Sequence, residues 1–312
     1  MIKHTIAVLL LAILSIVASD GFAMNGSAYL KIPNGARETA MGETGVSHSH
    51  GGAAMWWNPA LPAQGQTAIE FQTFRWLADG GGSFGGASIR TGWGGFGVYY
   101  FNLGMDDFEA RDRPGPPQAT FSLHQVVIAG GMAVNIWHGF SVGAAYKTLT
   151  EDIYGDRLNG FNVFDVGIHF VSSPTSSERS YSTSPPTRRG GTWSAGTVLT
   201  NIASSDATDD PLPLTIKSGL SYKRQFGEFG VMLSGEGSAV MRDDDDPAFH
   251  LGLEGDWIKQ LYLRCGLMTG YDTHFWTAGI GVHYKSVHFD FSLTPYDEPL
   301  GTVWRFGIGL GL

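Results

Sequence analysis

The chain is poor in cysteine and in charged residues. Cys265 is the only cysteine among 312 residues, so an internal disulfide is excluded. Charged residues make up 16 % of the chain, whereas an ordinary soluble domain contains about 25 %. The formal net charge of -9 argues against nucleic-acid binding, which requires a basic face. Cys265 falls at an apolar position of its segment, and we interpret it as a buried or lipid-facing hydrophobe rather than a reactive thiol.

Long apolar runs are confined to the start of the chain. Lys3 is followed by the mostly apolar residues 6–17 and then by small and polar residues up to Ala23. This pattern is typical of a secretory signal peptide, and the run is too short to cross a hydrocarbon core of about 30 Å as a helix. We expect residues 1–23 to be removed after Ala23. No later stretch of the sequence predicts a membrane-spanning helix.

Glycine and aromatic residues are abundant instead, and apolar residues alternate with polar or small ones. The sequence contains 44 glycines and 12 % aromatic residues. At the end of the chain Trp304, Phe306 and Ile308 alternate with Arg305, Gly307 and Gly309. This period of two is typical of a strand with one face toward lipid and one toward a lumen. Fourteen such segments are predicted, at 67–77, 83–91, 93–107, 120–137, 139–153, 159–171, 192–203, 212–224, 228–240, 247–258, 260–270, 274–285, 286–296 and 301–312.

These features together predict an all-β fold, a transmembrane antiparallel β-barrel of about fourteen strands over residues 67–312. A soluble β-sandwich would also show alternation. The export signal, the number of strands and the strand at the chain's end favour a multi-pass protein of the outer membrane, in contact with its lipid and lipopolysaccharide.

The connections and the tryptophans give this barrel a direction. Acidic connections follow the odd-numbered segments, and mostly tight turns follow the even-numbered ones. Short turns are typical of the periplasmic side. The Ser/Pro/Arg-rich residues 172–191 are an exception, and we interpret them as a long flexible periplasmic connection. Seven of the nine tryptophans lie near segment ends, which predicts two aromatic girdles, with Trp93, Trp137, Trp193 and Trp257 at the inner end and Trp76, Trp276 and Trp304 at the outer end.

The residues between the signal and the barrel carry two short motifs. Ala36 and Arg37 are followed by Met41 and Gly42, and further on lies the turn Trp57-Asn58-Pro59-Ala60. In this "ARxxxMG" stretch and "WNPA" turn the chain resembles the PorV/PorQ family of type IX secretion proteins, relatives of the FadL-type fatty-acid channels. The resemblance implies that residues 24–66 form a hatch, or plug, inside the lumen. A disordered periplasmic tail is the alternative.

The resemblance also implies a function. A PorV/PorQ-like protein would act through contacts with secretion-system proteins and secreted substrates. The alternative is a FadL-like channel that admits hydrophobic small molecules past the hatch. The barrel alone does not choose between them, because barrels of one size serve as channels, enzymes and scaffolds.

Few residues suggest metal or catalytic chemistry. His48 and His50 could bind a metal, but no carboxylate pair or cysteine nearby completes a site. We interpret the acidic run 243–246 as a solvated loop rather than a cation site. No nucleophile-elbow motif or dinucleotide fingerprint stands out. We therefore predict no enzymatic activity, no metal and no cofactor.

Polar residues on the lumenal face are predicted to pair. A tight turn near Lys259 would place Trp257 opposite Leu261, and equal steps then place Glu254 opposite Arg264. By the same arithmetic His283 faces His288, with Asp290 close enough to serve one of them. We expect a structural ion pair between Glu254 and Arg264.

Overall fold

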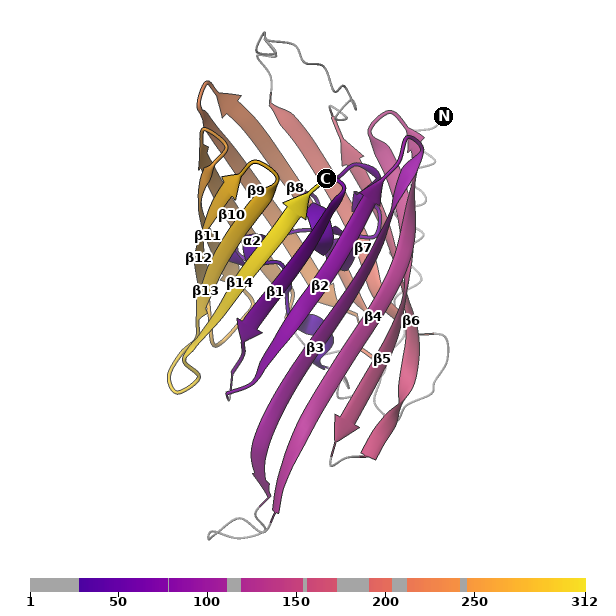
Figure 1. The fold of residues 1–312 in the computed structure, drawn as a ribbon, viewed down its shortest axis with the longest axis vertical. Helices are drawn as coiled ribbons and strands as arrows, with labels where there is room; N and C mark the ends of the chain where they lie inside the picture. Colours follow the sequence, from indigo (N-terminus) through magenta and orange to yellow (C-terminus); the bar gives the residue numbers. More distant parts are fainter. Residues whose placement is uncertain are drawn as a thin grey trace.

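The fold is a closed barrel of fourteen antiparallel strands around a short lumenal segment (Figure 1). The structure is a computed structural model, which describes residues 28–77, 79–110, 119–153, 156–172, 191–203, 212–241 and 246–312. β1 (Ala68–Arg75) pairs with both β2 (Gly81–Arg90) and β14 (Thr302–Gly311), so the sheet closes with no free edge. Closure satisfies the strand backbones internally, as a bilayer requires.

Every predicted strand is present, and the predicted barrel is confirmed. The strands are the ones named above and β3 (Gly94–Ala110), β4 (Ala119–Trp137), β5 (Phe140–Ile153), β6 (Asp156–Val171), β7 (Thr192–Ala203), β8 (Thr215–Phe226), β9 (Phe229–Val240), β10 (Ala248–Trp257), β11 (Leu261–Thr269), β12 (Trp276–Tyr284) and β13 (Val287–Pro295). No helix among the described residues is long and apolar enough to cross a membrane.

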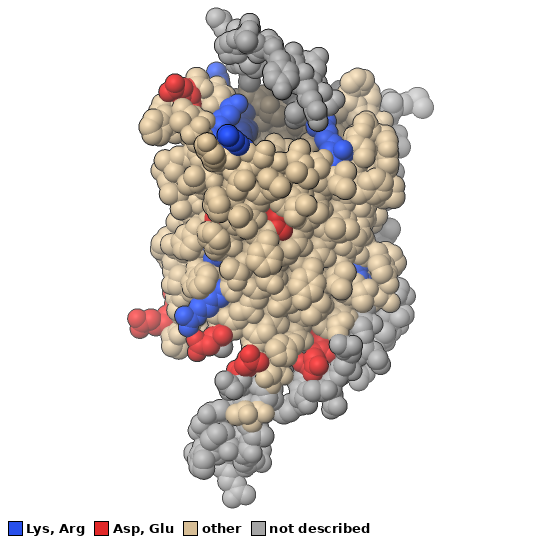
Figure 2. Space-filling view, in the orientation of Figure 1, with Lys and Arg blue, Asp and Glu red and all other residues tan. Residues whose placement is uncertain are grey.

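The wall has two chemically different faces. Large apolar side chains such as Phe71, Leu251 and Phe306 point outward and are exposed. Their inward neighbours are mostly polar or glycine. Figure 2 shows the result, a broad band with few charged residues, and most of the charged side chains in this view lie toward its two ends. Cys265 is on the outward face, so it is a lipid-facing residue. A closed barrel with an apolar outward face crosses a membrane with its strands, as multi-pass outer-membrane barrels do.

The turns distinguish the two ends of the barrel. At the end where β14 finishes, β10 and β11 are joined through residues 258–260, and β12 and β13 through Lys285 and Ser286. Ile258, Lys259 and Lys285 adopt positive φ there, as tight hairpins require. We call this the inner end, because short turns are typical of the periplasmic side. The expected signal peptide, most of the 172–191 connection and the acidic residues 243–245 lie outside the described residues.

The predicted girdles hold with one difference. The four inner-end tryptophans are exposed on or beside the wall. Trp276 and Trp304 at the outer end are also exposed, but to a smaller extent. Trp76 turns inward instead and lies against Tyr296, with ring centroids 6.3 Å apart. It follows the end of β1, where strand alternation no longer fixes its side.

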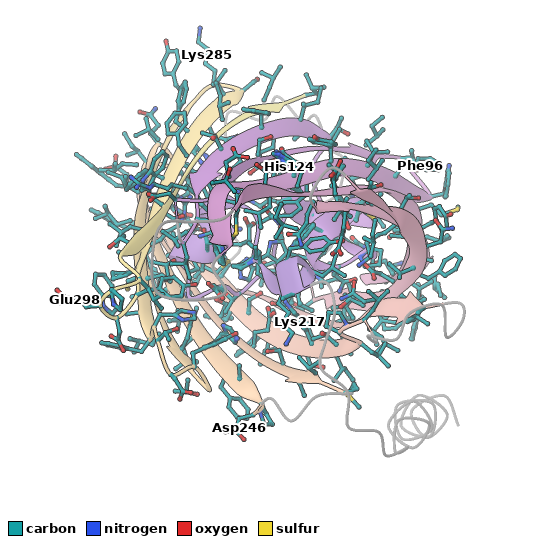
Figure 3. The ribbon with its side chains drawn as sticks, turned by 90° about the horizontal axis from the view of Figure 1, so that it is seen from below. Phe96, His124, Lys217, Asp246, Lys285 and Glu298 are labelled. Carbon is teal, nitrogen blue, oxygen red and sulfur yellow. The ribbon has the colours of Figure 1, made fainter. Side chains whose placement is uncertain are left out.

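Residues 28–66 lie inside the barrel and are called the lumenal segment here. They form the short elements η1 (Ala28–Lys31), α2 (Ala36–Ala40), η2 (Gly51–Ala53), α3 (Ala54–Trp57) and η3 (Leu61–Ala63). Seen along the barrel, the segment occupies the lumen, Lys217 points into it and Phe96 points away (Figure 3). The segment supplies much of the buried core, including Met55, Trp57 and Leu61.

Candidate functional site

The lumenal segment is hydrogen-bonded to strands all around the barrel. Glu236 of β9 accepts the backbone N–H groups of Gly45 and Val46 at 2.9 and 3.0 Å. His250 of β10 lies 2.7 Å from the Gly42 carbonyl, and Thr277 of β12 accepts the Gly42 N–H at 2.8 Å. Further contacts come from β1, β5, β6 and β13, through Glu70, Ser141, His169 and Ser292. The short helices cannot satisfy their own backbone groups, and the wall does so instead.

The Asn58-Pro59-Ala60 turn anchors the second half of the segment. The Asn58 side chain donates to the carbonyls of Val46 and Ile168 at 3.1 and 3.0 Å, while its Oδ1 accepts the Ala60 N–H at 2.9 Å. One amide thus joins two parts of the segment to β6. The adjacent Trp57 indole donates to the Asn34 carbonyl at 2.7 Å. The motif therefore holds the segment in its folded shape.

Glycines line the wall wherever the segment touches it. An added Cβ at Gly266 would overlap the backbone of Gly42, and one at Gly252 would meet the Met41 carbonyl oxygen. The same holds for inward glycines of other strands: Gly86 against Gly52, Gly95 against Pro62, Gly143 against Pro59 and Gly196 against Val46. Close backbone approach explains many of the chain's glycines.

A buried ionic cluster fixes the first motif to the wall. The Arg37 Nε lies 2.9 Å from Glu254 Oε2, and the Arg264 Nε lies 2.8 Å from the same oxygen. Arg264 also reaches Asp290 at 2.5 Å. Arg37 bonds Glu38 at 3.3 Å. The register Glu254↔Arg264 is the one derived from the turn at Lys259, but the pair belongs to a larger cluster in which the lumenal segment takes part.

Two groups of histidines surround this cluster. His283 is opposite His288, with ring centroids 5.2 Å apart, and both approach Asp290 at 3.9 and 4.0 Å. In the segment, His48 lies 3.1 Å from Thr44 Oγ1 and 3.3 Å from Arg37 Nη1. Burial, and next the nearby Arg37 charge, lower the pKa of His48 to about 3. Burial also holds the pKa of His50 well below its usual value. Both are therefore neutral at pH 7.

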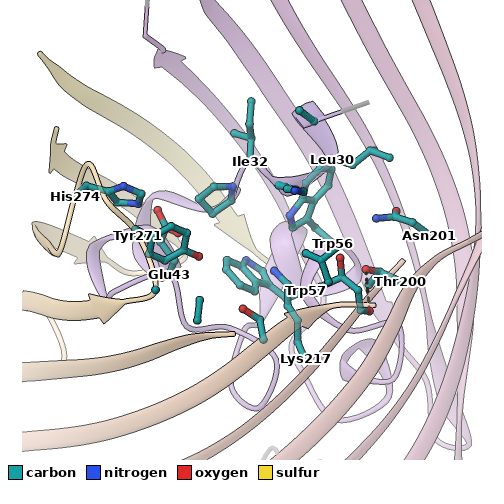
Figure 4. A pocket seen from close by; sticks show the side chains of 18 of the residues that line it. Leu30, Ile32, Glu43, Trp56, Trp57, Thr200, Asn201, Lys217, Tyr271 and His274 are labelled. Atoms are coloured by element: carbon teal, nitrogen blue, oxygen red, sulfur yellow. Dashed lines mark hydrogen bonds between the residues drawn. The ribbon is translucent and has the colours of Figure 1, made fainter. Parts of the chain in front are cut away.

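On the outer side of the segment lies a cavity of about 710 Å³, shown in Figure 4. We call it the outer cavity. Trp56 and Trp57 of α3 form one side. Trp56 packs against Tyr99 and Phe101, with ring centroids 5.2 and 5.3 Å away. The wall and outer loops complete it with Trp76, Tyr271, His274 and Tyr296.

Polar and charged residues line the rest of the outer cavity. The Lys217 Nζ lies 5.2 Å from the centre of the Trp57 ring, which is a cation–π contact. Glu43 lines the same cavity (Figure 4). Burial raises the pKa of Glu43, against the opposing pull of Arg305 and Lys217. Deeper in the wall, Lys147 and Asp165 neutralise each other at 2.8 Å. The cavity therefore has an aromatic side and a polar, partly charged side of similar extent.

On the inner side of the segment is a second cavity, of about 910 Å³, called the inner cavity. Its lining is mostly polar and charged and includes Arg37, His50, Lys223, Glu254 and Asp256. The lumenal segment thus separates an aromatic outer cavity from an ionic inner one. Among the described residues, no cluster of three or more His, Cys, Asp or Glu could hold a metal ion.

The residues of the two predicted motifs lie on different parts of the wall. Ala36, Arg37, Met41 and Gly42 are buried against β10–β13. Asn58, Pro59 and Ala60 lie against β5 and β6, whereas Trp57 lies beside Lys217 of β8. Sequence reasoning missed the outer-cavity residues Trp56, Tyr99, Lys217 and Tyr271. The inward phase of Tyr99 and Lys217 could have suggested them. Nothing in the sequence indicated which inward-facing residues would lie on the outer side of the lumenal segment and which on its inner side.

Comparison with known proteins finds neighbours in structure but not in sequence. No family model and no curated protein matches the chain. The fold is similar to the toluene transporter TbuX of Ralstonia pickettii, at 12 % identity and a TM-score of 0.54, over 89 % of this chain and 97 % of that one. It is also similar to the toluene transporter TodX of Pseudomonas putida, at 11 % identity and a TM-score of 0.56, over 93 % and 98 %. The monoaromatic hydrocarbon channel CymD gives 12 % identity and a TM-score of 0.58, over 90 % and 98 %.

Proposed function

We propose that the protein is a FadL-like channel that takes up hydrophobic small molecules through the outer cavity. The observation that carries the proposal is the aromatic cavity at the outer side of the lumenal segment. Its volume of about 710 Å³ is in the range of small-molecule sites, and its aromatic side supplies the apolar surface that such sites use. The structural neighbours support the proposal, because three of them are described as toluene transporters or a monoaromatic hydrocarbon channel.

The aromatic side of the cavity favours a flat apolar ligand, because indole and phenol rings pack well against aromatic or acyl carbon. On the polar side, Lys217 can donate to a hydroxyl or carboxylate of the ligand, and Glu43 can accept from a hydroxyl. No residue arrangement in the described chain requires chemistry on the ligand, and the function we propose is passage rather than catalysis.

In this proposal the lumenal segment is the hatch. It lies between the two cavities and is held by short hydrogen bonds and by the Arg37–Glu254 ion pair. A ligand can pass only if part of the segment shifts. We infer that ligand binding beside Trp56 and Trp57, which belong to the segment, biases it toward release.

Uptake by intact cells tests the proposal. Cells lacking the protein and cells expressing it would be given radiolabelled toluene or a labelled medium-chain fatty acid at low concentration. We expect faster uptake of at least one of them with the wild-type protein, and a loss of that gain in Trp56→Ala. The matched control is Trp304→Ala, a lipid-facing tryptophan. Equal uptake with and without the protein would contradict the proposal.

A secretion role is the second candidate, and it rests on the Arg37–Gly42 and Trp57–Ala60 motifs that resemble PorV/PorQ. These motifs hold the lumenal segment against the wall, which either function could use. The structural neighbours favour the channel. Retention of secreted proteins in a deletion strain, with uptake unchanged, would favour secretion.

A further inference from the structure

The lipid-facing side of the wall is hollowed over β7–β12. A groove of about 730 Å³ runs there, lined by Trp193, Tyr222, Leu233, Gly235, Leu253 and Cys265 among others. A second hollow of about 640 Å³ continues it, sharing Leu220, Gly235 and Leu251. We call the two together the furrow. It belongs to the outside of the barrel and is separate from both lumenal cavities.

The register explains why the wall is hollow at this place. Gly235 of β9 stands between Leu220 of β8 and Leu251 of β10, so a row of leucines is interrupted by a residue without a side chain. One row nearer the inner end, Leu253 pairs with the small Cys265. Across β13 and β14 the same face carries Phe289, Phe291 and Phe306, which fill the corresponding space. The furrow is thus a local feature of the wall.

A cation lies where the furrow approaches the inner end. Arg224 follows Tyr222 by two residues on the outward face of β8, and its guanidinium carbon is 4.8 Å from the Phe226 ring centre. Among the described residues it forms no ion pair with a carboxylate. The rings of Trp193 and Tyr222 lie beside it, with centroids 4.6 Å apart. Aromatic rings of this kind mark the membrane interface, where headgroups lie.

We propose that the furrow and Arg224 form a binding site for one anionic phospholipid. The phosphate lies against the Arg224 guanidinium at the inner interface, and an acyl chain fills the furrow over Gly235 and Cys265. The apolar hollow accounts for retention of a chain, and the outward cation, which has no carboxylate partner among the described residues, accounts for a preference for negative headgroups. A neutral phospholipid fits the furrow equally well but lacks the net charge that Arg224 attracts.

Native mass spectrometry of the full barrel in mild detergent tests the site. Phosphatidylglycerol and phosphatidylcholine with identical acyl chains would be added in equal amounts. We expect one retained phosphatidylglycerol, favoured about fivefold, the attraction of roughly one cation to an anionic lipid. Arg224→Gln should abolish the preference, and Lys285→Gln, which removes a cation from the turn between β12 and β13, should not. Equal retention of the two lipids by the wild type, or an unchanged preference in Arg224→Gln, would overturn the charge assignment.

Filling the furrow tests the acyl-chain part separately. Gly235→Phe should remove retention of both lipids, whereas Gly255→Ala, on the outward face of β10 with nothing within 4 Å of an added Cβ, should not. A bulky maleimide on Cys265 should have the same effect as Gly235→Phe, and Cys265→Ala should make the protein insensitive to the reagent. Heat-modifiable gel migration confirms that each variant is folded. Retention that survives both changes would mean adventitious lipid only and would overturn the site.

Discussion

The two lumenal cavities differ in the interactions that form them. One side of the outer cavity is built from aromatic rings, which pack without strict geometry and leave space for a ligand. The inner cavity borders a cluster of buried charges, where Arg37, Glu254, Arg264 and Asp290 need one another as partners. Removing one buried charge leaves another uncompensated. We infer that the outer side serves binding and the inner side holds the lumenal segment in place.

The ionic side should be the most sensitive to substitution. Arg264→Glu places a carboxylate beside Glu254 and Asp290 in a site with no exposed surface. We expect a loss of about 3–5 kcal/mol, the usual result of breaking a buried pair. The measurement is the temperature at which the folded gel band is lost. Lys285→Glu, at an exposed turn of the same end, is the control and should shift it little.

The cluster also changes the stability expected when the charges of Glu254 and Arg264 are exchanged. An isolated pair would be partly restored by adding Glu254→Arg to Arg264→Glu. Here the new arginine would face Arg37 and the new glutamate would still face Asp290. We expect little rescue from the swap. Substantial rescue would indicate that Arg37 and Asp290 contribute little to the cluster.

The boundary between the cavities should depend on the wall glycines. Gly266→Leu would push a side chain into the backbone of Gly42, and overpacking of this kind costs about 1–3 kcal/mol. We expect the barrel to stay folded and the lumenal segment to loosen, seen as increased ion conductance in planar bilayers and faster proteolysis of residues 28–66. Gly255→Leu faces lipid and should conduct like the wild type. Wild-type conductance in Gly266→Leu would contradict close packing of the segment.

Acid should loosen the inner side through the neutral histidines of the segment. The pKa of His48 is about 3 in the fold and about 6.5 in an unfolded chain. Stability from keeping it neutral is therefore complete above pH 6.5 and is lost as pH falls toward 3, by up to about 1.4 kcal/mol per pH unit. Conductance should rise between pH 6 and pH 4. His48→Gln should show a smaller rise over this interval, and an identical pH profile would contradict the assignment.

The smallest effect is expected at the long inner connection. Replacing residues 173–190 by a short turn removes polar chain between β6 and β7, while the Ser172 N–H still donates to the Trp193 carbonyl at 2.8 Å. Loop entropy changes slowly with length, so stability should change by less than about 1 kcal/mol. The heat-modifiable band should persist. Its loss would show that the connection takes part in folding.

The sequence predicts those parts of the structure that follow from the alternation of apolar and polar residues. Strand number, the outward rows and the register at Lys259 depend on local alternation and tight turns, and all three could be read from the sequence. The contact of Arg37 with Glu254 could not, because it joins residues far apart in the chain through a segment with no period. Likewise, Trp56 and Lys217 meet in one cavity only because α3 is folded back into the lumen.

A hydrophobic small molecule should bind in the outer cavity beside Trp56 and Trp57. Crystals of the full protein soaked with bromotoluene would locate it, because bromine gives an anomalous signal. We expect a bromine peak in the outer cavity of the wild type and its loss in Trp57→Ala. A wild-type crystal with bromine only on the lipid-facing wall, or with none bound in the lumen, would contradict it.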